Sequence, residues 1–381
     1  MDFDFSEEQE RFRKVVRDFA EREIAPHAEG WDREHVFPVD VVMAMGDLGL
    51  FGLPFPEKFG GSEADFTTLC IAIEELGRVD SSMAITLEAG VGLGAAPIVD
   101  YGTPEQQERW LPDLCAGRAL AGFGLTEPDA GSDAGATRTR AVRDGDEWVI
   151  DGAKAFITNS GTPITSVVTV TTRTGEGGDI TAILVPSGTP GFFVDPPYRK
   201  MGWHASDTHP LRFEECRVPV ANTLGERGYG FQQFLATLDN GRIAIAALAV
   251  GLAQACLEQS VAYAGAREAF GAPIGANQGV AFRCADLAVL VENARLLTYK
   301  AAWLKDNDRP FKRAAAMAKL YATEAAVEAS RHATQIFGGY GYVDETPVSR
   351  FYRDAKILEI GEGTSEIQRL VISRELGLPV R

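Results

Sequence analysis

Cysteines are few in this sequence and follow no pattern. The 381 residues include five of them, at Cys70, Cys115, Cys216, Cys256 and Cys284. Their number is odd and no two form a Cys-x-x-Cys pair, so neither a disulfide framework nor a zinc site is favoured. We expect reduced, mostly buried thiols and no metal site.

Segments that would direct the chain to a membrane are also missing. No run approaches the roughly 18 consecutive apolar residues that span a bilayer. The stretch from Met1 to Glu8 is acidic. It lacks the basic-then-apolar pattern of a secretory signal and the Arg- and Ser-rich composition of a transit peptide. We expect a protein without membrane contacts that is cytoplasmic, or a mature form whose presequence is missing.

Positive charge is scarce relative to negative charge. Lys and Arg number 37 against 54 Asp and Glu, which gives a formal net charge of −17. Nucleic-acid binding needs clustered Lys and Arg that neutralise phosphates. We therefore expect no nucleic-acid partner, and attribute the acidic balance to solubility.

Common nucleotide and hydrolase motifs are absent as well. The glycine clusters at 338–341 and 361–363 do not complete G-x-G-x-x-G and lie in no βαβ unit. The sequence has no P-loop, no HExxH and no GxSxG. These absences argue against an NAD-binding Rossmann domain.

The chain does contain an α–β–α order in three parts. Apolar residues recur at helical spacing over 5–116 and again from about 230 to the end. Residues 120–220 instead show β-branched runs and Gly/Pro turns, with no helices for βαβ crossovers. We predict an α+β multidomain fold with these parts: an N-terminal all-α domain (1–118), a middle β-sandwich or barrel (119–228) and a C-terminal helical domain (229–381).

Caps and turn residues mark individual elements. Thr103-Pro104-Glu105 combines an N-cap, a first-turn proline and a first-turn acid, which predicts a helix start. The dipeptides Asp144-Gly145 and Asp151-Gly152 predict turns on either side of a short strand at 147–150. The other predicted elements are helices at 66–76, 231–264, 281–304 and 312–337, and strands at 167–172, 180–185 and 211–214.

Two segments could hold polar ring edges of a ligand. The loop from Phe123 to Asp133 is rich in small and hydroxyl residues, and the segment Lys154 to Asn159 ends a strand with an aromatic, a hydroxyl and an amide. Taken alone, such segments are more often a turn-rich domain junction and an ordinary strand end.

Glu362 is the sharpest feature. It stands between two glycines, just before a predicted helix with Thr364 as its N-cap. Such a loop can approach a ligand closely. A carboxylate facing an apolar pocket has a pKa raised towards neutrality and makes a useful base. Taken alone, the same residue is also what an exposed turn glutamate would look like.

Together and in order, these segments resemble the acyl-CoA dehydrogenase family, especially its short-chain and bacterial members. The resemblance runs from Phe5-Ser6-Glu7-Glu8-Gln9, through Pro54–Gly61, to Gln368-Arg369. It implies a C-terminal four-helix bundle, FAD as cofactor, a homotetramer, and a role in fatty acid β-oxidation. Electrons would pass to an electron-transfer flavoprotein.

The resemblance also implies roles for particular residues. Glu362 is the expected catalytic base, which takes the α-proton of an acyl-CoA while a hydride leaves the β-carbon, giving a trans-2-enoyl-CoA. Ser132, Arg242, Gly361 and Gly363 are the expected substrate contacts. The expected FAD contacts are Leu125, Thr126, Phe156, Thr158, Arg267, Ala269, Phe270, Gln335, Gly338, Gly339, Thr364 and Glu366, with the segment around Arg267 reaching a neighbouring subunit's cofactor.

Three positions depart from the family pattern. Gly241 occupies the site where some members carry their base, so Glu362 is the only candidate. Phe156 stands where tryptophan is common, and Gly361 replaces an aromatic found in several relatives. We expect a short or branched acyl group and a pocket of unusual shape. The alternatives that remain open are an acyl-CoA oxidase, a dehydrogenase of carrier-protein-bound acyl chains, and a non-catalytic flavin or acyl-CoA-binding protein.

Overall fold

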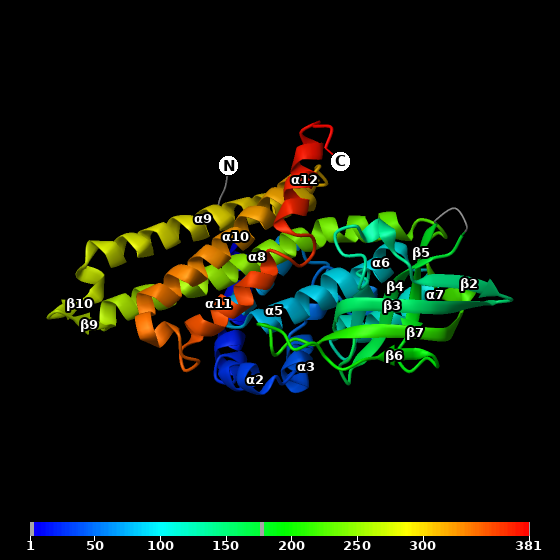
Figure 1. Ribbon diagram of the computed structural model, residues 1–381, viewed down its shortest axis with the longest axis horizontal. Coiled ribbons are helices and arrows are strands. Elements are labelled where there is room, and N and C mark those ends of the chain that lie inside the picture. Colours follow the sequence, from blue (N-terminus) through cyan, green and yellow to red (C-terminus); the bar gives the residue numbers. More distant parts are fainter. Residues whose placement is uncertain (1–3, 176–178, 381) are drawn as a thin grey trace.

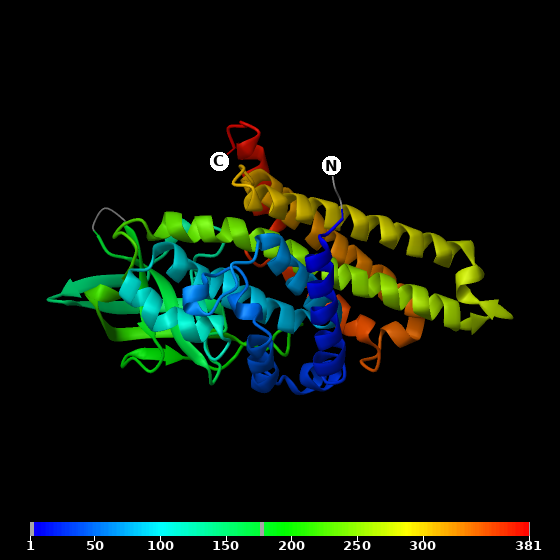
Figure 2. The same cartoon turned by 180° about the vertical axis from the view of Figure 1, so that it is seen from behind.

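The computed structural model describes residues 4–175 and 179–380. Three parts follow one another along the chain, with a β-sheet region at one end of the molecule and long helices reaching to the other (Figure 1). Seen from behind, the N-terminal helices lie between the sheet and the far ends of the long helices (Figure 2). The predicted α–β–α order is confirmed.

The N-terminal part is helical and begins with a well-capped helix. The Ser6 hydroxyl accepts a hydrogen bond from the Gln9 backbone N–H, and the Gln9 side chain accepts one from the Ser6 N–H. This reciprocal pair fixes the helix start. The helices of this part are α1 (Glu7–Phe19), α2 (Ala28–Glu34), α3 (Val39–Asp47), α4 (Phe66–Val79), α5 (Ser81–Glu88), α6 (Ala96–Tyr101) and α7 (Pro104–Cys115), with π-helical η1 (Ala20–Ile24) and η4 (Ala89–Ala95) and 3₁₀ turns η2 (Leu50–Gly52) and η3 (Glu57–Phe59).

The predicted helix start at Thr103 is confirmed. The Thr103 hydroxyl caps α7 by accepting a hydrogen bond from the Gln106 backbone N–H, and the Gln106 side chain accepts one from the Thr103 backbone N–H, with Pro104 in the first turn.

The cap of α5 is more important for the site. The buried Asp80 carboxylate accepts from the backbone N–H groups of Ser82 and Met83, and so begins α5.

The middle part is one eight-stranded sheet in the order β6-β7-β3-β2-β4-β5-β8, with β1 parallel to β4. Its core contains Trp148, Ile150, Val168 and Phe213. The strands are β1 (Leu120–Gly124), β2 (Arg140–Asp144), β3 (Glu147–Thr158), β4 (Thr165–Arg173), β5 (Ile180–Pro186), β6 (Phe192–Val194), β7 (Thr208–Pro219) and β8 (Thr223–Leu224), with 3₁₀ turns η5 (Ala134–Ala136) and η6 (Val220–Asn222).

The turn predicted at Asp151-Gly152 is wrong. Strand β3 continues through it to Thr158 and stays paired with β7, although the register shifts between Ile150 and Gly152. Gly152 has φ +147° and lies against Thr139, where a Cβ would not fit. The glycine therefore marks an irregularity inside a strand rather than a turn between strands.

The C-terminal part is built on long helices. The first of them, α8, ends before Arg267, and a small β-hairpin follows. The elements are α8 (Gly230–Ala266), β9 (Glu268–Ala269), β10 (Ala272–Pro273), α9 (Gln278–Asp306), α10 (Lys312–Phe337), α11 (Pro347–Leu358) and α12 (Ser365–Glu375), with 3₁₀ turns η7 (Ile274–Ala276) and η8 (Gly338–Gly341). The predicted helix at 312–337 is confirmed at both ends.

Helix α8 is long and largely buried, and it packs closely against α4. A Cβ at Gly77 would lie 3.0 Å from the Leu248 carbonyl oxygen, and one at Gly251 would overlap the Glu74 carbonyl. These glycines let α4 and α8 approach closely. Segments Ser81–Tyr101 and Gly230–Ala266 are apolar enough by composition to cross a bilayer, but 78% of each apolar window is buried. Both are core helices of the folded protein.

Candidate active site

Glu362 lies in a left-handed turn between α11 and α12. Its φ is +52° and that of Gly363 is +95°, a conformation that costs a non-glycine residue about 1 kcal/mol. The next residue, Thr364, caps α12 by accepting from the Ile367 backbone N–H at 3.3 Å. The predicted helix start is confirmed. Glu362 lies in the turn that precedes this helix.

The Glu362 carboxylate points inwards although its backbone is half-exposed. Both carboxylate oxygens are inaccessible to solvent, and no N–H or hydroxyl group among the described residues donates to them. The Oε2 atom lies against Gly241 of α8, where a Cβ would overlap it. The exposed turn glutamate that the sequence left open is therefore not what the fold produces.

A second carboxylate faces Glu362 from α5. Glu88 is fully buried, and neither of its oxygens receives a hydrogen bond from a described residue. A Cβ at Gly92, in the π-helical η4, would lie 3.0 Å from Glu88 Oε1. π-helical turns of this kind recur at functional sites. Two buried carboxyl groups without donors are stable together only if they share a proton.

The electrostatics agree with that view. Burial raises the pKa of Glu88 well above its ordinary value, and the nearby Glu362 carboxylate raises it further. Burial also raises the pKa of Glu362 to about 7, while a hydrogen bond with Glu88 and the positive charges of Lys319 and Arg242 act in the opposite direction. These shifts favour the protonated form of Glu88, whereas Glu362 gains or loses its proton around neutral pH.

Two cations lie near this pair. Arg242, on α8, is 4% exposed and forms an ion pair with Asp239. Lys319, on α10, is completely buried, and its Nζ donates to the Gly363 carbonyl at 2.8 Å. Gln368, on α12, donates to the same carbonyl at 2.9 Å and to the Glu362 carbonyl at 3.3 Å.

The polar segments of the middle part meet at the ends of β1 and β3. The Ala155 N–H donates to the Thr126 carbonyl at 2.8 Å, which ties the loop after β1 to β3. Below it lies a buried ion pair: Lys154 Nζ donates to Glu127 Oε1 at 2.8 Å and to the Leu125 carbonyl at 3.3 Å. Burial lowers the pKa of Lys154 to about 8, whereas Lys154 holds that of Glu127 at about 2 against the effect of burial.

This edge of the sheet reaches the carboxylate pair through α5. Asn159, next to Thr158, donates from its side chain to the Thr86 carbonyl at 3.1 Å, two residues before Glu88. The aromatic ring of Phe156 is 63% exposed and stacks on Tyr198 with ring centres 4.7 Å apart. Helix α5 thus contacts both the end of β3, through the Thr86 carbonyl, and the Glu362 turn, through Glu88.

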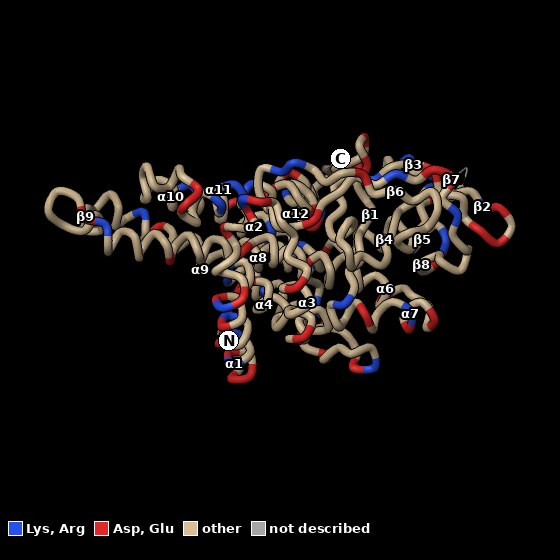
Figure 3. The backbone as a smooth tube through the Cα atoms, turned by 90° about the horizontal axis from the view of Figure 1, so that it is seen from below, with Lys and Arg blue, Asp and Glu red and all other residues tan. Residues whose placement is uncertain are grey.

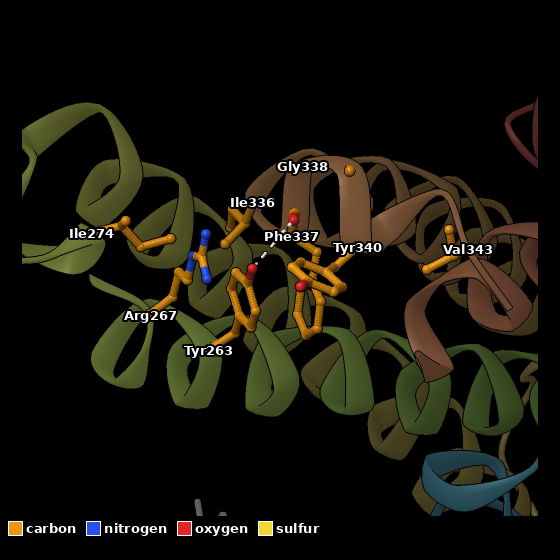
Figure 4. Close-up of a pocket in the computed structure, with 9 residues that line it drawn as sticks. Tyr263, Arg267, Ile274, Ile336, Phe337, Gly338, Tyr340 and Val343 are labelled. Atoms are coloured by element: carbon orange, nitrogen blue, oxygen red, sulfur yellow. Dashed lines mark hydrogen bonds between the residues drawn. The ribbon is translucent and has the colours of Figure 1, made fainter. Parts of the chain in front are cut away.

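Three of the other predicted contacts gather around a cavity far from the sheet. Arg267, Gly338 and Gly339 line one cavity of about 530 Å³, together with Tyr263, Ile336, Phe337 and Tyr340. The Tyr263 hydroxyl donates to the Phe337 carbonyl at 3.5 Å, and the Arg267 guanidinium lies 5.9 Å from the Tyr340 ring centre (Figure 4). Figure 1 shows the nearby β9–β10 hairpin far from the sheet along the long axis.

Sequence models of three consecutive domains match the chain. They are the acyl-CoA dehydrogenase N-terminal domain at residues 6–118, the middle domain at 122–216 and the C-terminal domain at 228–377. The chain belongs to the acyl-CoA dehydrogenase family. It is an FAD-dependent oxidoreductase of that family, and the predicted three-domain fold is the family's own.

Individual acyl-CoA dehydrogenases are similar over their whole length. The Bacillus subtilis protein named "Probable acyl-CoA dehydrogenase YngJ" is 51% identical, over 99% of this chain and all of that one. The mitochondrial short-chain specific acyl-CoA dehydrogenase of Mus musculus is 47% identical, over 97% of this chain and 90% of that one. The structure of butyryl-CoA dehydrogenase from Megasphaera elsdenii superposes with a TM-score of 0.96 at 41% identity, covering 99% and 100% of the two chains.

The remaining positions expected of an acyl-CoA dehydrogenase lie as follows. Ser132 is exposed in the loop between β1 and β2, and Gln335 is exposed near the end of α10. Phe270 projects fully into solvent from the hairpin, where Ala269 pairs with Ala272. Leu125 is buried in the loop that follows β1. Gly361 is half-exposed in the Glu362 turn, and Glu366 is exposed on α12.

Two buried residues of the site were missed by sequence reasoning. Glu88 is the single charge in the apolar stretch 81–99, and Lys319 shares a helical face with Ala315, Ala322 and Ala326. A lone charge on an apolar face is the signal that could have found both, since a charge is buried only where something compensates for it.

Proposed function

We propose that this chain oxidises short-chain acyl-CoA thioesters to trans-2-enoyl-CoA, with Glu362 as the base that removes the α-proton. One observation supports the proposal above all: a buried carboxylate that receives no hydrogen bond from any described N–H or hydroxyl group, with a pKa of about 7. A base with a pKa near the working pH combines a large ionised fraction with adequate basicity.

The residues present fit an FAD. The hydroxyls of Thr126 and Thr158 and the Thr126 backbone N–H make no hydrogen bond to a described residue, so they are free to bond the polar edge of a flavin ring. At the other end, Arg267 beside the glycines Gly338 and Gly339 offers a cation and open backbone for a pyrophosphate. Leu125, Phe156, Ala269, Phe270, Gln335, Thr364 and Glu366 complete the proposed contacts.

The chemistry divides between cofactor and protein. Bound FAD supplies an acceptor for the hydride that leaves the substrate's β-carbon. Glu362 takes the α-proton onto its carboxylate. The Glu362 backbone N–H, which bonds no described carbonyl, would donate to the thioester carbonyl and stabilise the negative charge that develops there. Gly361, Gly363, Ser132 and Arg242 are the proposed surroundings of the thioester and the CoA arm.

A second copy of the chain would complete the cofactor site. The sheet that carries the flavin-edge residues and the β9–β10 hairpin next to the Arg267 cavity lie far apart along the long axis of one chain (Figure 1). One dinucleotide therefore needs the hairpin of a neighbouring subunit. Self-association is also supported by exposed apolar side chains every seven residues along α9, namely Phe282, Val289, Leu296 and Trp303, which are 43–61% exposed. This α9 stripe suits helix-to-helix contact, and we propose a homotetramer.

Electrons would leave towards an electron-transfer flavoprotein. The exposed Phe156–Tyr198 stack lies beside the proposed flavin edge, where a partner could approach. Figure 3 shows acidic and basic positions interspersed over the backbone, in keeping with a protein rather than a nucleic acid as partner. We place the enzyme in the cytoplasm, in the β-oxidation of short fatty acyl groups.

The test is anaerobic mixing of the purified flavoprotein with acyl-CoA. Butyryl-CoA or isobutyryl-CoA should bleach the oxidised flavin band in proportion to the enzyme added. Absence of bleaching across a panel of chain lengths would refute the proposal. Hydrogen peroxide formed in air at the rate of turnover would identify an oxidase instead. Bleaching by acyl groups on a carrier protein, but not on CoA, would redefine the substrate.

A further inference from the structure

Lys319 is a buried cation that the proposed reaction has not used. It stands in the middle of α10 with no solvent exposure, on the face formed by Ala315, Ala322 and Ala326. An ammonium in such a place is costly unless it is compensated. Among the described residues, the only hydrogen bond that its Nζ makes is the 2.8 Å bond to the Gly363 carbonyl.

That bond falls on the turn that aims Glu362. The positive φ angle of Glu362, unlike that of Gly363, persists only if neighbouring groups hold it. Lys319 and Gln368 do so together: three hydrogen bonds from the two side chains converge on the carbonyls of Glu362 and Gly363. A Cβ at Gly363 would lie 2.9 Å from Gln368 Nε2, so the clamp is closely fitted.

The charge of Lys319 is also available to the site. Arg242, the other nearby cation, is paired with Asp239, whereas Lys319 bonds a neutral carbonyl. The charged groups that act on Lys319 are Glu362 and Glu359 from the turn, Arg242 from α8 and Glu324 from α10. Those that act on Glu362 are Glu88, Lys319 and Arg242.

We propose that Lys319 is a positioning residue for the proposed base. Its ammonium holds the Gly363 carbonyl, so that the left-handed turn directs the Glu362 carboxylate at the substrate's α-carbon. Its charge favours the ionised form of that carboxylate. This inference rests on the proposed function, and it adds a residue on α10 that touches neither substrate nor cofactor.

The test separates charge from position. Holoenzymes of the wild type, Lys319→Met, Lys319→Arg, Gln368→Leu and the exposed control Lys300→Met are compared. The first measurement titrates with pH the long-wavelength charge-transfer band formed with an acyl-CoA that has sulfur in place of its β-carbon. That analogue loses its α-proton but cannot give up a hydride. The second measurement is the rate of flavin bleaching by butyryl-CoA.

Each variant has a distinct expectation. A nearby cation favours the ionised carboxylate, so Lys319→Met should move the titration midpoint upwards by roughly one pH unit or more. Its bleaching rate at neutral pH should fall about tenfold or more. Lys319→Arg keeps the charge but not the 2.8 Å contact, so its midpoint should stay while its rate falls at every pH. Gln368→Leu should behave like Lys319→Arg, and Lys300→Met like the wild type.

The outcomes distinguish the two proposals. If Lys319→Met matches the wild type in both midpoint and rate, the role of Lys319 is wrong. If Lys319→Met fails to fold, unchanged rates in both Lys319→Arg and Gln368→Leu contradict the clamp, and slowed rates with an unmoved midpoint support it. If the wild type itself gives no charge-transfer band and no bleaching with any acyl-CoA, the proposed function fails and this role with it.

Discussion

Gly241 and Glu362 occupy space that only one side chain can fill. The Glu362 Oε2 atom lies where a Cβ at position 241 would stand. Glu362 belongs to the turn before α12, and Gly241 is a buried residue of α8. The structure therefore explains why one position is glycine while the other is glutamate.

Gly241→Ala tests this relationship. The added methyl group should push the carboxylate away from its position and slow flavin bleaching by about tenfold or more, since small displacements of a reacting group reduce rates strongly. The helix itself should tolerate alanine, which favours helix by about 1 kcal/mol over glycine. Thermal unfolding should show a folded enzyme. Gly265→Ala, at an open site near the end of α8, is the control, and an equally slowed control would point to the helix rather than the base.

Glu362→Gln tests the base itself. The amide keeps the size of the side chain but cannot accept the α-proton, so bleaching by butyryl-CoA should slow by roughly 10²- to 10⁴-fold. The variant should still bind acyl-CoA, and this binding can be measured from the change that it causes in the flavin absorption spectrum. Turnover within a few-fold of the wild type would mean that another group removes the proton.

The rate should depend on pH in a definite direction. Glu362 acts only when ionised, and its pKa lies at about 7 instead of the ordinary 4.5. Bleaching should therefore be slow at pH 5.5 and rise through about pH 7 to a plateau. Stopped-flow measurement at saturating acyl-CoA across this window checks it. A flat profile from pH 5.5 to 8.5 would show that bound substrate or another group controls the ionisation.

Lys154→Met tests the support beneath the proposed flavin edge. Removing the ammonium leaves the Glu127 carboxylate buried without its cation, which typically costs about 3–5 kcal/mol. It also releases the Leu125 carbonyl. Urea unfolding should show the loss of stability, and the ratio of FAD to protein after gel filtration should fall. Lys300→Met serves as the exposed control; full FAD content with unchanged stability in Lys154→Met would refute the role.

The α9 stripe makes a prediction about assembly. Val289→Glu with Leu296→Glu places two charges on an apolar surface that is 43–60% exposed in one chain. If this surface is an interface, light scattering should show a smaller particle, because buried unpaired charges oppose association. FAD should be lost as well, since one chain holds only part of each proposed site. An unchanged particle would locate the interface elsewhere.

Much of the fold could be predicted from local patterns. The helix at 312–337, the cap at Thr103 and the helix start at Thr364 were confirmed because capping and periodicity are short-range effects. The turn at Asp151-Gly152 was not, because whether a glycine ends a strand or bends it depends on the partner strand. Here β7 pairs with β3 on both sides of the irregularity.

The site divides in the same way. The sequence alone determined that a carboxylate flanked by glycines would stand before a helix, and motifs along the chain indicated the family. Only the tertiary structure decided that Glu362 is buried, that Glu88 faces it from α5, and that Lys319 lies beneath its turn from α10. Glu88 on α5 is hundreds of positions from the other two, and Lys319 on α10 belongs to a different element from the Glu362 turn. Their ionisation is set by burial and by charges a few ångströms away, and these exist only once the helices have packed.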